Sequence, residues 1–316
     1  MQILCGFQQF VVLALATTPF GIPATAFWMY VSASLLLILG LITISKELPQ
    51  EHGIDKIMPF GPLFFGIPMA VFGSEHFTLT ADIANLVPRW IPAHTFWVYL
   101  VGLGFICAGL SLAILVQARL AAALVGMTML IFVLVMDIPG LVANPHNRFS
   151  WALALRELAF GSGAFAFAIS PRSTRPQQPS TARPIAAWAL LPRLFIGIAS
   201  IFYGVEHLLH PANVPGVPLE KLTPVWIPGR IFLSYFVGVV LILAGACLLV
   251  NKKARIAATY LGLTILLTVL WIYLPILAAA PKDVVALNYF FDTLLFCGTI
   301  LLLANAMDKE TSVARR

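Results

Sequence analysis

The chain has 316 residues, of which 60% are hydrophobic and only 10% are charged, and its mean hydropathy is +0.94. Soluble domains contain about 45–50% apolar and about 25% charged residues, so this composition excludes a soluble globular protein. The formal net charge of +6 comes from basic residues gathered in loops and tails, and no basic–aromatic stripe indicates nucleic-acid binding.

Apolar runs of about 20 residues recur along the chain, the length that a helix needs to cross about 30 Å of hydrocarbon. The runs are continuous rather than alternating, which favours helices over a membrane β-barrel and makes the lipid bilayer the expected partner. Residues 1–24 are apolar but interrupted by prolines, and whether they cross the membrane is left open. The predicted spans lie near residues 26–45, 59–77, 94–117, 120–138, 150–169, 188–209, 229–250, 254–275 and 284–306.

Two matching pairs of segments indicate an internal repeat. Segment 63–76 (LFFGIPMAVFGSEH) matches segment 194–207 (LFIGIASIFYGVEH) at an offset of 131 residues. Segment 87–102 matches segment 223–238 at an offset of 136 residues, so the second copy has gained five residues in the intervening loop. The larger offset then holds for Gly109/Gly245, Arg119/Arg255, Gly126/Gly262, Thr128/Thr264 and Pro139/Pro275. Motifs that stay in register over this length predict a tandem duplication.

The predicted fold class is an all-α polytopic membrane protein with two tandem parallel four-helix units, at 59–170 and 188–306. A Pro-, Ser- and Arg-rich linker at 171–187 joins them, residues 1–58 add one or two N-terminal membrane segments and a charged loop, and residues 307–316 form a tail. The arginines of the linker place it in the cytoplasm, so we expect a multi-pass protein of the cytoplasmic (inner) membrane with a cytoplasmic C-terminus. Both units then share one orientation, related by a pseudo-two-fold axis along the membrane normal.

The motif G-x-E-H, followed by W-I-P, a tyrosine and glycine pairs seven residues apart (Gly102/Gly109, Gly238/Gly245), resembles the DoxX-like family of small four-helix membrane proteins. The resemblance covers both repeats. It implies a membrane redox setting, with a quinone as the candidate cofactor and a soluble or membrane-bound redox partner, but it does not establish an enzyme. A branch of the family that handles disulfides would be expected to use paired cysteines, and Cys5, Cys107, Cys247 and Cys297 form no C-x-x-C pair.

Ionisable residues in a membrane are costly and therefore suggest a functional site. The candidates for handling protons or binding a ligand are Glu75, His76, Asp137, Arg156, Glu157, Glu206, His207 and Asp292. The predicted topology places them all in the outer half of the membrane. A carboxylate beside a neutral imidazole could relay protons or hold a quinone head group. The alternative is structural, with one member of each Glu-His pair bonded to the W-I-P loop and the charged pairs linking helices.

Three further histidines, His94, His146 and His210, do not complete a metal site with His76 and His207, and no metal is expected. A haem held by two histidines between the repeats is the weaker alternative. The W-I-P motifs are interpreted as interfacial anchors, because Trp prefers the headgroup level and Pro stiffens the return into the membrane. These anchors are Trp90, Pro92, Trp226 and Pro228.

Three functions remain open. The first is a component of membrane redox chemistry with a quinone pocket in the outer leaflet. The second is a small-molecule or ion transporter, against which no matched Gly/Pro breaks occur in mid-span. The third is a non-catalytic scaffold for a soluble enzyme.

Overall fold

The computed structural model describes residues 18, 21–170, 186–216 and 220–307. The first apolar segment, most of the linker and most of the tail lie outside this part of the chain. The described residues form helices and no strand apart from an isolated bridge between Asn213 and Leu222. The elements are α2 (Ala24–Ile44), η2 (Leu48–Gln50), η3 (Gly53–Phe60), α3 (Gly61–Thr78), α4 (Thr80–Ala84), α5 (His94–Ile114), α6 (Ala118–Phe132), η4 (Val133–Asp137), α7 (Ile138–Ala143), α8 (Arg148–Ile169), α9 (Ala186–Leu209), α10 (Arg230–Val250), α11 (Ala254–Thr268), η6 (Val269–Tyr273), α12 (Leu274–Ala279) and α13 (Val284–Ala306).

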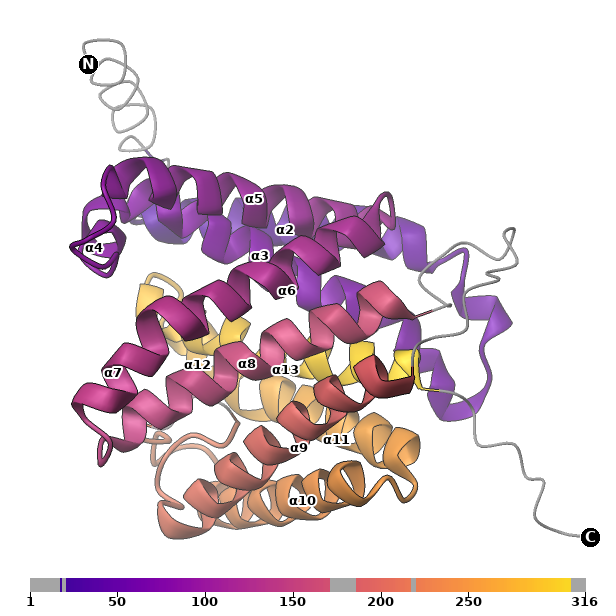
Figure 1. Cartoon of the computed structure of the whole chain (residues 1–316). Helices are drawn as coiled ribbons and strands as arrows, with labels where there is room; N and C mark the ends of the chain where they lie inside the picture. The colour runs from indigo at the N-terminus through magenta and orange to yellow at the C-terminus, as the bar shows by residue number, and fades with distance from the viewer. Residues whose placement is uncertain (1–17, 19–20, 171–185, 217–219, 308–316) are drawn as a thin grey trace, which may run out of the picture.

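Eight helical segments of the described chain are long and apolar enough to cross a membrane. They are Ala24–Ile44, Gly53–Thr78, His94–Ile114, Ala118–Ala143, Arg148–Ile169, Arg230–Val250, Ala254–Ala279 and Val284–Ala306. Helix α9, of 24 residues, lies lengthwise against α8 and α10 (Figure 1). Leucines such as Leu103, Leu124 and Leu243 remain exposed on the outside, as lipid-facing side chains do. The chain is therefore an all-α, multi-pass integral membrane protein, as the sequence predicts.

Local backbone features recur at the offset of 136 residues. Helix α5 begins after Ala93 and α10 begins after Gly229, and both residues have left-handed backbone angles. Left-handed residues also form the turns between α5 and α6 and between α10 and α11. We call α3–α8 the first unit and α9–α13 the second unit. The end of both units that carries His76, near the C-terminus of α3, and His207, near the C-terminus of α9, is called the histidine end. It lies opposite the N-terminus of α9.

The first two helices of each unit pack with glycine against glycine. A Cβ added to Gly102 would lie 3.0 Å from the carbonyl oxygen of Gly73, and one added to Gly238 would lie 3.0 Å from that of Gly204. Gly66 meets Gly109, and Gly197 meets Gly245, in the same way one heptad further along. The spacing of seven residues therefore brings the two backbones into contact at two levels, as small residues do in membrane helix pairs.

The two units meet along α8 and α13, their fourth helices. Arg156 forms an ion pair with Asp292, and a Cβ on Gly163 would touch the side chain and backbone of Thr299. Both contacts join residues exactly one repeat offset apart, at two levels of the same helix pair. Such contacts require α8 and α13 to run in the same direction and in register. An axis that relates the units therefore passes between these two helices, roughly along them.

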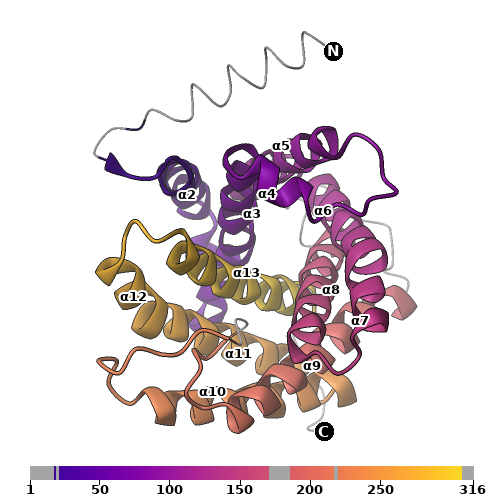
Figure 2. The same cartoon turned by 90° about the vertical axis from the view of Figure 1, so that its left-hand side faces the viewer.

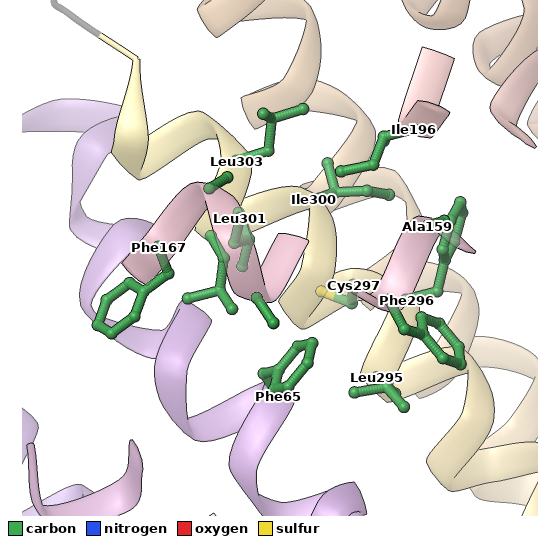
Figure 3. Packing of buried hydrophobic residues seen from close by; sticks show 14 of the residues in the cluster. Phe65, Ala159, Phe167, Ile196, Leu295, Phe296, Cys297, Ile300, Leu301 and Leu303 are labelled. Carbon is green, nitrogen blue, oxygen red and sulfur yellow. The ribbon is translucent and has the colours of Figure 1, made fainter. Parts of the chain in front are cut away.

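Helix α13 lies near the centre of the bundle, as the view along the helices shows (Figure 2). Its residues from Leu294 to Ala304 are buried on every face, which is typical of a helix inside a bundle. In Figure 3, Phe296, Cys297 and Ile300 of this helix are surrounded by side chains of three neighbours. The labelled neighbours are Phe65 of α3, Ala159 and Phe167 of α8, and Ile196 of α9.

The span predicted at 120–138 continues to Ala143, and the span predicted at 254–275 continues to Ala279. A π-turn precedes the proline in each, at Val133–Asp137 and at Val269–Tyr273. Proline cannot donate the backbone hydrogen bond that an α-helix needs, and a π-turn absorbs this misfit without ending the helix. The two matched π-turns therefore leave each span a continuous helix. The π-turns also place Asp137 within a span instead of at its end.

Candidate functional site

A cavity of about 890 Å³ lies between α3, α5, α6 and α8 of the first unit and is closed on one side by α13 of the second unit. Most of its wall is apolar, and sulfur and aromatic side chains such as Met69, Phe105 and Phe160 contribute to it. Polar groups gather at the histidine end of the cavity. They are Glu75 and His76 from α3, Arg156 and Glu157 from α8, and Asn288 and Asp292 from α13. The cavity thus combines an apolar body with a polar end, the usual character of a small-molecule site.

The cavity opens toward the lipid-facing side of α5 and α6. The lining residues Leu100 of α5 and Leu120, Leu124 and Ile131 of α6 each leave about half of their surface exposed. Cys107 of α5 also lines the cavity and is exposed. The part of the cavity wall formed by α5 and α6 is therefore its most exposed part.

Arg156 is the basic group of the polar end. Its guanidinium forms the ion pair with Asp292, while its Nε atom is buried with no hydrogen-bond partner among the described residues. Asp137 and Glu157 also lie close enough to Arg156 to interact with its charge. One guanidinium therefore faces three nearby carboxyl groups. Ionised groups are expensive away from water, so protons or a bound ligand must balance this excess of acid.

Asp137 and Glu157 place two carboxyl groups side by side. The two side chains lie within hydrogen-bond distance of each other, so a proton on either one can link them. The Oδ2 atom of Asp137 and the Oε2 atom of Glu157 are buried and have no other partner among the described residues. Adjacent carboxylates repel one another unless they share a proton. This pair can therefore store a proton or receive a hydrogen bond from a ligand.

Glu75 is only 7% exposed, and its Oε1 atom has no hydrogen-bond partner in the part of the chain that the structure describes. Its nearest polar neighbour is the Asn288 side chain. His76 turns its Nδ1 atom toward the carbonyl oxygen of Phe72, 2.7 Å away, and its ring meets Phe105 edge-on. Both residues of the Glu-His motif therefore line the cavity, and neither is bonded to the W-I-P loop.

The same motif has other partners in the second unit. Glu206 forms an ion pair with Arg148 at 3.0 Å and lies 3.8 Å from His210. His207 is fully buried, and its Nε2 atom lies 2.8 Å from both the backbone nitrogen and the carbonyl oxygen of Gly216. The second Glu-His pair thus connects α9 to α8 and to its own loop, which is the structural role considered from the sequence.

The loop of the second unit fills the position that corresponds to the polar end of the cavity. Val214 is fully buried, and the Tyr273 hydroxyl donates a hydrogen bond of 2.8 Å to the carbonyl oxygen of Pro215. Gly216 lies against Thr293, which is the counterpart of Glu157. These loop residues belong to the stretch that is five residues longer in the second repeat. We call Val214–Gly216 the plug.

The predicted anchors lie at the surface of the histidine end. Trp90 is 74% exposed and Trp226 is also exposed, while the carbonyl oxygen of Pro92 accepts a hydrogen bond from Trp97. Pro228 stands two residues before α10. Within the described ranges, no group of three or more His, Cys, Asp and Glu side chains could hold a metal ion.

Sequence reasoning missed Asn288, Arg148 and the plug. Asn288 occurs one turn before Asp292 on an apolar helix, a spacing that could have indicated it. Arg148 lies in a loop in the sequence, and only the fold brings it to Glu206. The five extra residues were visible, but their burial could not be inferred from them.

The fold and the cavity define an integral membrane protein of two four-helix units, with a polar-ended apolar cavity in the first. No protein-family model, no curated protein and no solved structure matches the chain.

Proposed function

We propose that this protein binds a lipid-soluble quinone in the cavity of the first unit and serves as a component of membrane redox chemistry. The observation that carries the proposal is the apolar cavity of about 890 Å³ that ends in Glu75, His76, Arg156, Glu157, Asn288 and Asp292. A quinone has the same division, with an apolar tail and a head that exchanges hydrogen bonds.

The exposed part of the cavity wall supports this class of ligand. Quinones reside in the hydrocarbon, and entry past the lining residues exposed on α5 and α6 would not cross water. The resemblance of the G-x-E-H and W-I-P motifs to the DoxX-like family points to the same chemistry. We propose further that the protein lies in the cytoplasmic membrane with the histidine end facing outward, since the arginines of the linker mark the opposite end as cytoplasmic.

The carboxyl groups near the cavity support a role in redox chemistry, because they can exchange protons with a quinone. A quinone takes up protons when it is reduced and releases them when it is reoxidised. Glu75 and the adjoining pair Asp137 and Glu157 could exchange these protons, because each has a buried oxygen without a donor in the described structure.

The test is the binding of a short-tailed benzoquinone, in its oxidised and its reduced form, to the purified full chain in nanodiscs. Glu75→Gln should weaken the binding of the tighter form several-fold to about tenfold, because an amide cannot exchange a proton with the head group as the carboxyl group does (~0.5–1.5 kcal/mol). Glu206→Gln is the matched control, since Glu206 is the same residue of the repeat but is occupied by Arg148. Failure of both forms to bind the unmodified protein, or equal losses in the two variants, would overturn the proposal.

A further inference from the structure

The cavity beside the first unit extends along the whole of α5. Its wall includes Val87 and Ile91, which precede α5 at the histidine end, and Gln117 and Leu120, which follow α5 at the opposite end. A helix of 21 residues is about 30 Å long, close to the thickness of the hydrocarbon. A quinone head is far shorter than this length, so another part of the ligand must fill the rest.

The middle of the cavity is lined by apolar side chains. Val101 and Phe105 of α5 and Val125 of α6 belong to this stretch of the wall. The hydroxyl of Thr128, which also lines it, donates a hydrogen bond to the carbonyl oxygen of Leu124 in its own helix, 2.9 Å away. An apolar chain can therefore lie here without taking a hydrogen-bond partner away from a polar group.

Gly104 widens the cavity at mid-depth. Gly102 and Gly109 of the same helix lie against the backbone of α3, whereas a Cβ atom added to Gly104 would meet nothing within 4 Å, so helix packing does not require a glycine there. Its counterpart in the second unit is Val240, which packs against the buried core. Helix α10 also lies in closer contact with α11 than α5 does with α6. The two units therefore differ at mid-depth as well as at the plug.

We infer that the ligand of this cavity carries a long apolar tail, which lies extended between α5 and α6 and passes Gly104. This inference rests on the proposed function and deepens it, because it names a long-tailed quinone as the ligand and Gly104 as the residue that admits the tail. Bilayer chains are as apolar as the wall, so burial alone does not favour the tail over a lipid chain. The bound head does favour it, because it holds the tail beside the wall at a high effective concentration.

Photo-crosslinking of the purified full chain in nanodiscs tests the path of the tail. The probe is a benzoquinone whose long alkyl tail carries a diazirine in its outer half. It should label Cys107 and Leu124, which line the cavity, and an unlabelled long-tailed benzoquinone in about tenfold excess should lower this labelling about tenfold. Their counterparts Leu243 and Tyr260 are exposed on the second unit, and their labelling should not respond to the competitor.

A matched pair of substitutions tests the role of Gly104. Gly104→Val introduces the residue of the second unit and should lower the competed labelling about fivefold or more, because its side chain takes space that the tail fills. Gly140→Val is the control, since a Cβ atom added to Gly140 also meets nothing within 4 Å and Gly140 lies on α7, outside the cavity wall. Equal labelling in the two variants would overturn the role of Gly104.

The remaining outcomes separate the tail from the head. If the competitor lowers the labelling equally in both units, or if a plain hydrocarbon of the same length competes as well as the quinone, the wall holds bilayer chains and the inference is overturned. If the short-tailed benzoquinone binds but no competed labelling of Cys107 and Leu124 occurs, the inference fails while the proposed function stands. Binding of neither a short-tailed nor a long-tailed quinone would overturn both.

Discussion

The histidine ends of the two units are built from equivalent positions of the repeat. In the first unit these positions surround a cavity, and in the second unit the plug fills the corresponding space. In the first unit, Glu75 and Glu157 have buried oxygens with no donor in the described structure, and the space beside them is a cavity. In the second unit, Glu206 has Arg148, and His207 has the backbone of Gly216. The same motif therefore serves a possible ligand in one copy and the stability of the fold in the other.

The difference lies in three exchanges. Asp137 and Glu157 of the first unit correspond to Tyr273 and Thr293 of the second, which removes two carboxyl groups and supplies a hydroxyl donor to the plug. The five extra residues then bring the plug to that donor. A loop of the chain itself can thus fill a polar site and convert it into packed interior. The role of a Glu-His motif therefore depends on the residues that contact it in the fold.

The largest loss of stability is expected from breaking the ion pair between Arg156 and Asp292, which joins the two units. Asp292→Asn should lower the free energy of unfolding by about 3 kcal/mol, because it breaks the ion pair that joins α8 to α13 and leaves only Asp137 and Glu157 near the Arg156 guanidinium. Unfolding of the detergent-solubilised protein, followed by circular dichroism, measures this loss.

Arg156 and Asp292 occupy the same position in the two repeats, so exchanging them provides a control for this prediction. If Arg156 and Asp292 stabilise each other across the axis between α8 and α13, the double exchange Arg156→Asp with Asp292→Arg should restore part of the stability lost by either single change. A double variant whose loss equals the sum of both single losses would show that the pair is not coupled.

The second prediction concerns removal of the plug, which should make the second unit resemble the first. Deletion of residues 212–216 shortens the loop to the length of the first repeat and removes the fully buried Val214. The free energy of unfolding should fall by about 2–3 kcal/mol, from the apolar surface and hydrogen bonds that are lost. Thermal unfolding of the purified protein checks this value.

Labelling shows whether the deletion also opens the site. Thr293→Cys should be unreactive toward a small maleimide in the full-length loop and reactive after the deletion, while Glu157→Cys should react in both backgrounds because it lines the existing cavity. These assays are made after Cys5, Cys107, Cys247 and Cys297 are replaced by alanine or serine. A Thr293→Cys thiol that stays protected would mean that helices close over the space, and the two units would then differ by more than the plug.

The all-helical membrane fold and the tandem repeat could be predicted from the sequence, because apolar run lengths and aligned motifs are local signals. The spacing of seven between glycines is visible in the sequence, but the helix that each pair packs against is known only from the fold. The cavity could not be predicted, since it depends on how far α5 stands from α6. The π-turns were also missed, because Pro139 and Pro275 normally indicate a helix end. The distinct roles of Glu75 and Glu206 depend on partners that are 58 or more residues away in the chain.

The smallest loss of stability is expected at Tyr273, which is compared with Asp137 at the same position of the first repeat. Tyr273→Phe should lower the free energy of unfolding by about 1 kcal/mol, because it removes the hydrogen bond to Pro215 and leaves that carbonyl buried. Asp137→Asn, at the matching position, should cause a smaller loss, since Asp137 holds no loop in place and its contact with Glu157 can be kept by an amide. Both variants are measured by thermal unfolding under the same conditions. Equal losses would mean that Asp137 supports the fold as Tyr273 does, whereas the expected contrast shows that stability resides in the plugged copy and the free carboxyls remain available to a ligand.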